Sequence, residues 1–209
     1  MADNADARPD GFGLWIRGWD VVAAFALLAA AFLLVRLDAV PHLTALAGDK
    51  GYFARKPLLL DTYRHGYTFE TVRDHLRALG EDGRTYYAHT FVPIHDLALS
   101  VFLLTFTVLF ILYATQSAKG HALWLPPYVR RLLLVPPVLQ FLFDVSENLM
   151  LRHLMDEYPR ISVKVVEAAS QSTQFKWIAI YVTTLILIGL AAFTLSRLLV
   201  QERAPDASA

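Results

Sequence analysis

Four long apolar runs, separated by polar segments, dominate the hydrophobic pattern of the chain. The runs lie at about 19–37, 96–116, 132–155 and 175–200. Each is close to the roughly 20 residues that an α-helix needs to cross the hydrocarbon core of a bilayer. The pattern therefore predicts an all-α membrane protein with four transmembrane helices.

The polar segments divide the chain into a bundle and two tails. Residues 1–18 are predicted to form a disordered cytoplasmic tail, residues 19–200 the transmembrane bundle, and residues 201–209 a second polar tail. Ala45-Leu46-Ala47 has the small residues of a signal-peptide cleavage site. It lies too far beyond the first apolar run, which favours an uncleaved first span.

The loop at 40–95 is long and has a helical periodicity of its own. Thr68 is a good N-cap for a helix that Gly80 would end. A second short helix is predicted over 84–91, ending before Pro93. We expect this extracytoplasmic loop to form a helical cap over the mouth of the bundle. The alternative is that its amphipathic helices lie on the lipid surface.

The third apolar run carries a stripe of polar side chains. Residues three and four positions apart lie on one face of a helix. A charge near the bilayer centre costs about 2.5–3.5 kcal/mol, so such residues normally face the bundle interior and indicate function. The stripe consists of Gln140, Asp144, Glu147, Asn148 and Arg152.

Proline and polar residues mark the two ends of this third span. Pro136 and Pro137 lack the backbone N–H groups that a helix needs, which predicts a kink just before the stripe. Residues 156–173 are predicted to form a short amphipathic connection to the fourth span.

Chain connectivity brings further polar residues to the end of the bundle where the stripe lies. Asp96 opens the second span from that side, and Thr173 and Lys176 open the fourth. We therefore predict a polar intramembrane site near the outer face. Its candidate catalytic residues are Asp144 and Glu147, and its candidate ligand-binding residues are Asp96, Asn148, Arg152, Thr173 and Lys176.

Two interpretations of this site are open. Asp144 and Glu147 are suited to general acid–base chemistry, and Lys176 or Arg152 to holding a phosphate or carboxylate headgroup. The structural alternative is an ion-pair network that joins the helices. A lysine at a helix entrance can also extend its ammonium group to the interface.

Charge placement indicates the orientation. Four spans put both termini on one side of the membrane. The second polar loop concentrates Lys119, Arg130 and Arg131 beside the bilayer, which favours cytoplasmic termini. We expect a multi-pass protein of the bacterial inner membrane.

Composition excludes several classes of function. The chain is 56% hydrophobic, too apolar for an ordinary soluble domain. Its formal net charge of +0 gives no basic excess for binding nucleic acid. It has no cysteine, which removes disulfides and thiolate chemistry. Asp61 and His65 are four apart, but no histidine has the spacing of a known metal motif, so no metal or other cofactor is predicted.

Five short motifs lie between Tyr63 and Trp177. They are Gly66–Glu70, Leu79–Arg84, Asp144 with Glu147-Asn148, Tyr158-Pro159, and Thr173 with Lys176-Trp177. In combination they resemble an uncharacterised family of small bacterial four-span integral membrane proteins. The resemblance implies this architecture and the position of the site, and it implies no reaction.

Three classes of function are consistent with these patterns. The first is a binding or accessory role for a lipid-like amphiphile taken from the surrounding membrane lipid. The second is a membrane-embedded acid–base enzyme that acts on a lipid or isoprenoid substrate. The third is a proton-coupled transporter, for which four spans would require a homodimer.

Overall fold

The computed structural model of the chain describes residues 16–115 and 125–202. Residues 1–15 of the predicted disordered tail, Lys119 and residues 203–209 lie outside this part of the chain, whereas residues 16–18 lie within it. Every regular element in the described ranges is a helix. The all-α prediction is therefore confirmed for them.

Four helical stretches are long and apolar enough to cross a membrane, namely Gly18–Leu46, Phe69–Thr115, Pro127–Asp156 and Val163–Ser196. The most apolar part of each has a mean hydropathy between 1.3 and 2.5, yet only 11–22% of its residues are buried inside the molecule. So much exposed apolar surface requires cover from lipid. The prediction of a four-span membrane protein is confirmed at this level.

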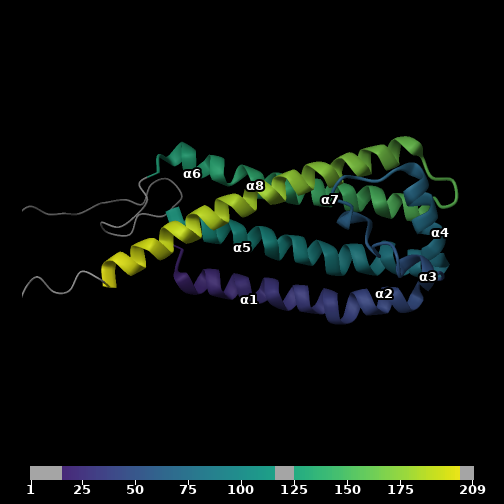
Figure 1. Cartoon of the computed structure of the whole chain (residues 1–209), viewed down its shortest axis with the longest axis horizontal. Coiled ribbons are helices and arrows are strands. Elements are labelled where there is room, and N and C mark those ends of the chain that lie inside the picture. The colour runs from purple at the N-terminus through teal and green to yellow at the C-terminus, as the bar shows by residue number, and fades with distance from the viewer. Residues whose placement is uncertain (1–15, 116–124, 203–209) are drawn as a thin grey trace, which may run out of the picture.

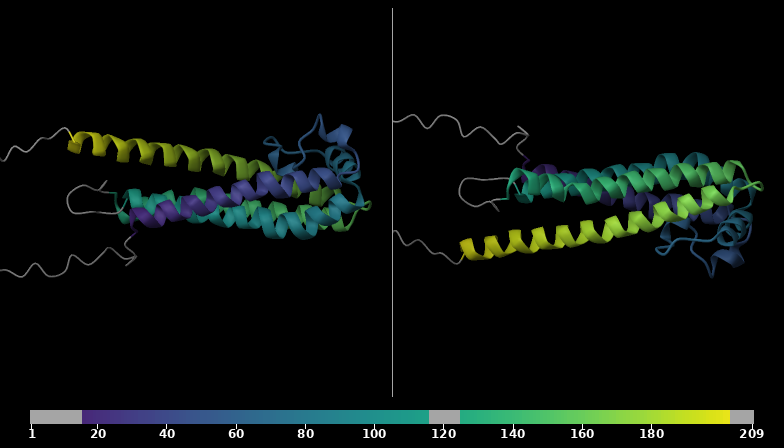
Figure 2. Two further views of the ribbon diagram at one scale, coloured as in Figure 1. Left: turned by 90° about the horizontal axis from the view of Figure 1, so that it is seen from below. Right: turned by 90° about the horizontal axis from the view of Figure 1, so that it is seen from above.

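The four stretches form one elongated bundle (Figure 1). Helix α1 (Gly18–Leu34) packs on α5 (Leu97–Thr115), and α7 (Val135–Asp156) packs on α8 (Val163–Glu202). Helix α8 diverges from the other helices toward its C-terminal end (Figure 2). The start of α1 and the end of α8 lie at the same end of the bundle, as four spans require.

The first helical stretch is longer than predicted. After α1 it continues through the π-helix η1 (Val35–Ala39) into α2 (Val40–Leu46), nine residues beyond the expected end at 37. Pro41 does not end the helix, because it lies in the first turn of α2 directly after the wider π-helical turns.

The segment between the first two spans contains α3 (Lys50–Phe53), the 3-10 helix η2 (Leu60–Thr62) and α4 (Phe69–Tyr86). Thr68 caps α4 as predicted, since its Oγ1 accepts a hydrogen bond from the Thr71 N–H at 3.2 Å. Gly80 has a φ of 71°, which interrupts the helix at the predicted position. The Gly48 N–H docks on this break by donating to Leu79 O at 3.1 Å.

The helix after Gly80 does not end before Pro93, so that prediction was wrong. It continues through the π-helix η3 (Tyr87–Asp96) directly into α5. Proline removes one donor and crowds the carbonyl four residues before it in an α-helix. In a π-helix each carbonyl accepts a hydrogen bond from the N–H five residues later and not four, so Pro93 is accommodated.

The third stretch is interrupted close to the two prolines, as predicted. Helix α6 (Pro127–Leu133) ends at Leu134, and α7 begins at Val135 with the prolines in its first turn. The first N–H groups of a helix have no partner within the helix, so proline is tolerated there.

Helix α8 begins at Val163, ten residues before the predicted end of the connection at 173. Val166, Ala169 and Thr173 follow one another at helical spacing and are buried, so this first part of α8 packs along one face. Thr173 and Lys176 therefore lie inside a long helix and not at its entrance.

An apolar core lies at the end of the bundle where α4 packs on α7 and α8. It combines side chains from residues 40–95 with side chains from α7 and the start of α8. Its fully buried members include Leu43, Leu60, Leu76, Leu79, Leu151 and Leu154. This core holds the polar residues described next in fixed positions.

Candidate functional site

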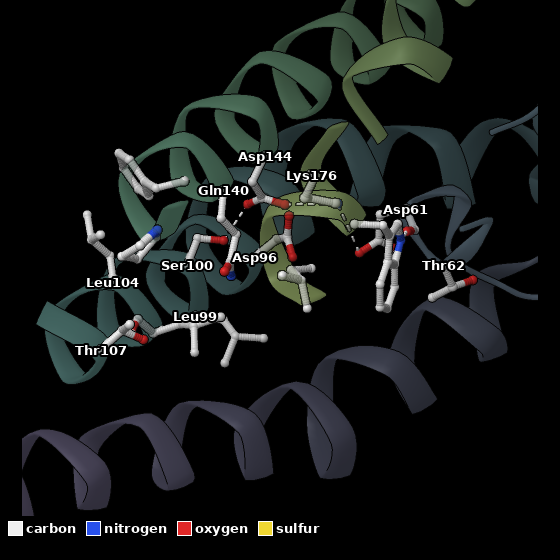
Figure 3. A pocket seen from close by; sticks show the side chains of 15 residues that line it. Asp61, Thr62, Asp96, Leu99, Ser100, Leu104, Thr107, Gln140, Asp144 and Lys176 are labelled. Atoms are coloured by element: carbon white, nitrogen blue, oxygen red, sulfur yellow. Dashed lines mark hydrogen bonds and ion pairs between the residues drawn. The ribbon is translucent and has the colours of Figure 1, made fainter. Parts of the chain in front are cut away.

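Lys176 is the centre of a buried polar cluster (Figure 3). Its side chain projects from α8 and the residue is only 4% exposed. Its Nζ lies 2.5 Å from Glu147 Oε2, 3.0 Å from Asp144 Oδ1 and 3.9 Å from Asp61 Oδ2. The ammonium group thus faces three carboxylates and does not extend to the interface.

Glu147 joins three segments of the chain. It lies on α7 and is 0% exposed. Its Oε1 accepts a hydrogen bond from Thr173 Oγ1 of α8 at 2.5 Å. The Tyr67 hydroxyl oxygen, just before α4, lies 3.3 Å from the same threonine oxygen. Glu147 is therefore held by both of its carboxylate oxygens.

Asp144 and Asn148 connect α7 to the second helical stretch. Asp144 Oδ2 accepts a hydrogen bond from the Ser100 hydroxyl of α5. One turn later, Asn148 Nδ2 donates to Asp96 Oδ2 at 2.5 Å and lies 3.4 Å from Asp144 Oδ2. These contacts extend the cluster from Lys176 to the junction of η3 and α5.

The cluster contains more acids than bases. Four carboxylates, from Asp61, Asp96, Asp144 and Glu147, surround the single ammonium group of Lys176. A buried charge without a partner is costly, so the excess must be balanced by bound protons or by a ligand. Among the described residues, no group of three or more His, Asp or Glu is arranged to hold a metal ion.

Asp61 lies between α3 and α4, outside the spans. Burial raises the pKa of its carboxyl group, and the Lys176 ammonium partly opposes this by stabilising the charged form. Its Oδ1 is buried and accepts no hydrogen bond from the described residues. Asp61 Oδ1 could therefore bind a proton or accept a further hydrogen bond.

A cavity of about 270 Å³ opens beside the cluster, between α5, α7 and α8. Asp144, Asp96 and Ser100 lie together beside Lys176, while Leu99 and Leu104 line the cavity on the far side of these groups from Asp61 (Figure 3). The polar lining residues are Asp61, Thr62, Asp96, Ser100, Thr107, Gln140, Asp144 and Lys176, and the apolar ones are Leu99, Leu103, Leu104, Pro137, Phe141, Trp177 and Ile180.

A tight turn holds Asp61 against α8. The Trp177 Nε1–H donates to the backbone oxygen of Asp61 at 2.9 Å. Gly66 has a φ of +78°, and a Cβ there would lie 2.4 Å from both Gln174 Nε2 and Ser170 Oγ. Only glycine fits this close approach without displacing the helix side chains.

The structure brings together six of the seven residues predicted for the site. Asp96, Asp144, Glu147, Asn148, Thr173 and Lys176 belong to the cluster. Arg152 is directed elsewhere, because its side chain is 46% exposed and its Nε lies 4.0 Å from Asp156 Oδ2. The roles assigned to these residues stay predictions.

Sequence reasoning missed three members of the cluster, which are Asp61, Tyr67 and Ser100. Ser100 follows Asp96 by four residues and therefore shares its helix face, a signal that was present in the sequence. Tyr67 and Asp61 belong to a loop, where periodicity gives no direction for a side chain.

Comparisons of the sequence with models of known families, with curated proteins and with solved structures found no match. No family is therefore assigned to this chain, and its function must be inferred from the geometry of the cluster and the cavity.

Proposed function

We propose that this multi-pass membrane protein binds a lipid-like amphiphile in the cavity between α5, α7 and α8. The observation that carries the proposal is the mixed lining of the cavity, which combines apolar side chains with the polar side chains of the Lys176 cluster. Ligand cavities typically combine an apolar wall with a few polar groups that fix orientation. The hydrocarbon chain would lie along Leu103, Phe141 and Ile180.

The charges of the cluster favour a headgroup that donates hydrogen bonds or is cationic. Lys176 already faces three carboxylates within 4.0 Å, so an anionic headgroup would add to a negative excess. Asp61 lines the cavity and has an oxygen without a donor. An amine or hydroxyl headgroup beside Asp61 and Asp144 would donate hydrogen bonds to the accessible carboxylate oxygens and offset the negative excess.

The second candidate is a membrane-embedded acid–base enzyme. The sequence suggested both Asp144 and Glu147 as catalytic residues, whereas the geometry favours Asp144 alone. Asp144 lines the cavity, whereas Glu147 is fully buried behind Lys176 and does not. A general acid or base must lie within hydrogen-bond reach of the substrate. In this case Asp144 would be the catalytic residue and Glu147 would position Lys176.

The proposal places the cavity near the outer face of the bacterial inner membrane, with both termini cytoplasmic. Arg130 and Arg131 on α6 support this orientation. Residues 40–95 would then form an extracytoplasmic cap over the polar end. The chain has no cysteine, so single cysteines introduced at exposed positions of this segment would report its side by labelling with an impermeant reagent.

The test is a comparison of three amphiphiles that share one chain: dodecylamine, dodecanol and dodecyl phosphate. Each is added to the purified protein in a neutral detergent, and thermal unfolding is recorded. We expect dodecylamine or dodecanol to raise the melting temperature and dodecyl phosphate to have a much smaller effect, because binding to the folded state stabilises it.

Asp61→Asn and Asp144→Asn should reduce this shift, and Asp74→Asn is the control because Asp74 lies on the exposed face of α4. Equal shifts from all three amphiphiles, or a shift that survives both cavity variants, would contradict the proposal. An amphiphile recovered chemically altered from wild type but not from Asp144→Asn would favour the enzyme.

A further inference from the structure

A second cavity, of about 250 Å³, lies against the same stretch of α8. Trp177 lines this cavity as well as the first. The two linings otherwise differ in their residues. The second cavity is lined by Arg64, His65, Gln174, Trp177, Ile178 and Tyr181.

The charge of this second lining is opposite to that of the first. It contains the guanidinium group of Arg64 and the imidazole ring of His65, and none of its residues is an acid. Asp61, three residues before Arg64, lines only the first cavity. The turn that joins the two residues therefore places the Asp61 carboxyl group in the first cavity and the Arg64 guanidinium group in the second, with Trp177 lining both.

Arg64 is held in a defined place. Its guanidinium carbon lies 4.8 Å from the centre of the Trp177 ring, a cation–π contact. The turn that carries it closes with the Gly66 N–H donating to Tyr63 O at 2.8 Å. The Tyr67 N–H then donates to Ser170 Oγ of α8 at 2.9 Å. The guanidinium group is thus held over the Trp177 ring, beside α8.

The second cavity lies where two aromatic side chains meet exposed apolar side chains of α8. Trp177 and Tyr181 lie next to each other with ring centres 5.9 Å apart, and such aromatic pairs are typical of the membrane–water interface. On the same helix, the apolar side chains of Ile178 and Leu185 are 57% and 69% exposed. An acyl chain that follows α8 would bring its headgroup to Arg64.

We propose that this second cavity binds the phosphate headgroup of an anionic phospholipid of the surrounding leaflet. Arg64 would hold the phosphate through two parallel N–H groups, and His65 and Gln174 would supply further donors. The acyl chains would lie on Ile178, Tyr181 and Leu185. This site is independent of the amphiphile cavity and goes beyond the proposed function.

The test is lipid retention. The protein is reconstituted in bilayers of phosphatidylcholine with a minor fraction of phosphatidylglycerol, extracted gently, and its bound lipid is counted by native mass spectrometry. We expect wild type to retain phosphatidylglycerol well above its bulk fraction and Arg64→Gln to lose at least about fivefold of that enrichment, the equivalent of roughly 1 kcal/mol.

Arg73→Gln is the matched control, because Arg73 is a half-exposed arginine of α4 that does not line the cavity. It should retain the lipid like wild type. Melting temperatures of both variants establish that they are folded. Equal enrichment in wild type and Arg64→Gln, or equal loss in both arginine variants, would overturn the proposal.

A second arm distinguishes a lipid from a free anion. Inorganic phosphate and glycerol phosphate are added at increasing concentration to the lipid-loaded protein. We expect no displacement at concentrations that leave the bilayer intact, because the acyl chains contribute apolar contact that these anions lack. Displacement by inorganic phosphate alone at low concentration would show a free-anion site and would overturn the lipid assignment.

Discussion

The two cavities that Trp177 lines balance their charges in opposite ways. In the first, Asp144, Glu147 and Lys176 are buried, with Asp61 and Asp96 partly buried beside them, so the charges must compensate one another. In the second, Arg64 is exposed and contacts the Trp177 ring, and we propose a lipid phosphate as its anionic partner. The charges of the first cavity thus face one another, whereas the guanidinium group of Arg64 in the second faces away from the cluster and is exposed.

Removing the cation of the buried cluster should have the largest effect. Lys176→Met leaves Asp144 and Glu147 buried without their partner, which is expected to cost about 3–5 kcal/mol of folding stability. Thermal unfolding by circular dichroism in detergent measures it. Thr183→Val is the control, because Thr183 is buried on the same helix and its hydroxyl has no partner among the described residues. Equal losses in both variants would show that the cluster is not held by Lys176.

Changing the turn should weaken both cavities at once. Gly66→Ala places a Cβ 2.4 Å from two side-chain atoms of α8 at a φ of +78°, so a loss of more than about 1 kcal/mol is expected. Binding of dodecylamine and retention of phosphatidylglycerol should both fall, because the turn carries Asp61 and Arg64. Gly189→Ala is the control, since nothing lies within 4 Å of a Cβ there and it should be neutral or stabilising.

The wall between the cavities can be altered alone. Trp177→Phe keeps a ring beneath Arg64 but removes the N–H that donates to the Asp61 backbone oxygen, at a cost of about 1 kcal/mol. We expect dodecylamine binding to fall more than phosphatidylglycerol retention. A larger effect on the lipid would mean that the ring face, and not the Asp61 bond, is the important contact. Thermal unfolding measures the loss of stability, and the dodecylamine and phosphatidylglycerol measurements show which cavity is affected more.

The smallest expected effect is a pH dependence from Asp61. A carboxyl group whose pKa is raised by folding adds stability below its unfolded pKa of about 3.9 and loses it as pH rises through the folded value. Asp61→Asn has no such titration. The melting temperature of wild type should therefore fall relative to that of Asp61→Asn as the pH rises above about 4. A constant difference, or the opposite slope, would show that Lys176 outweighs burial at this position.

The sequence was sufficient for the spans because long apolar runs are a direct consequence of bilayer thickness. It was also sufficient for most of the cluster, since the order of the spans alone brings Asp96, Lys176 and the α7 stripe to one end. The predicted polar stripe wrongly included Arg152 in the site. A spacing of four residues advances about 40° per step around a helix, so Arg152 points well away from Asp144.

Asp61 could not be predicted, because its place depends on a contact with Trp177 that is 116 residues away in sequence. No periodicity in residues 54–68 indicates that this turn returns to α8. The start of α8 was missed for a related reason. Residues 163–173 are polar enough to suggest a connection, and their helix is stabilised by packing on α7, which local sequence does not show.

The number of residues in the π-helical segment η3 affects the geometry of the polar cluster. A π-helix contains more residues per turn than an α-helix, so Tyr87–Asp96 acts as an insertion between α4 and α5. Deleting one residue there without a compensating change in winding would rotate α5 by roughly a quarter of a turn relative to α4. Ser100 would then turn away from Asp144. We expect substitutions at its exposed positions, such as Ile94, to be tolerated, whereas a change in its number of residues should disrupt the cluster.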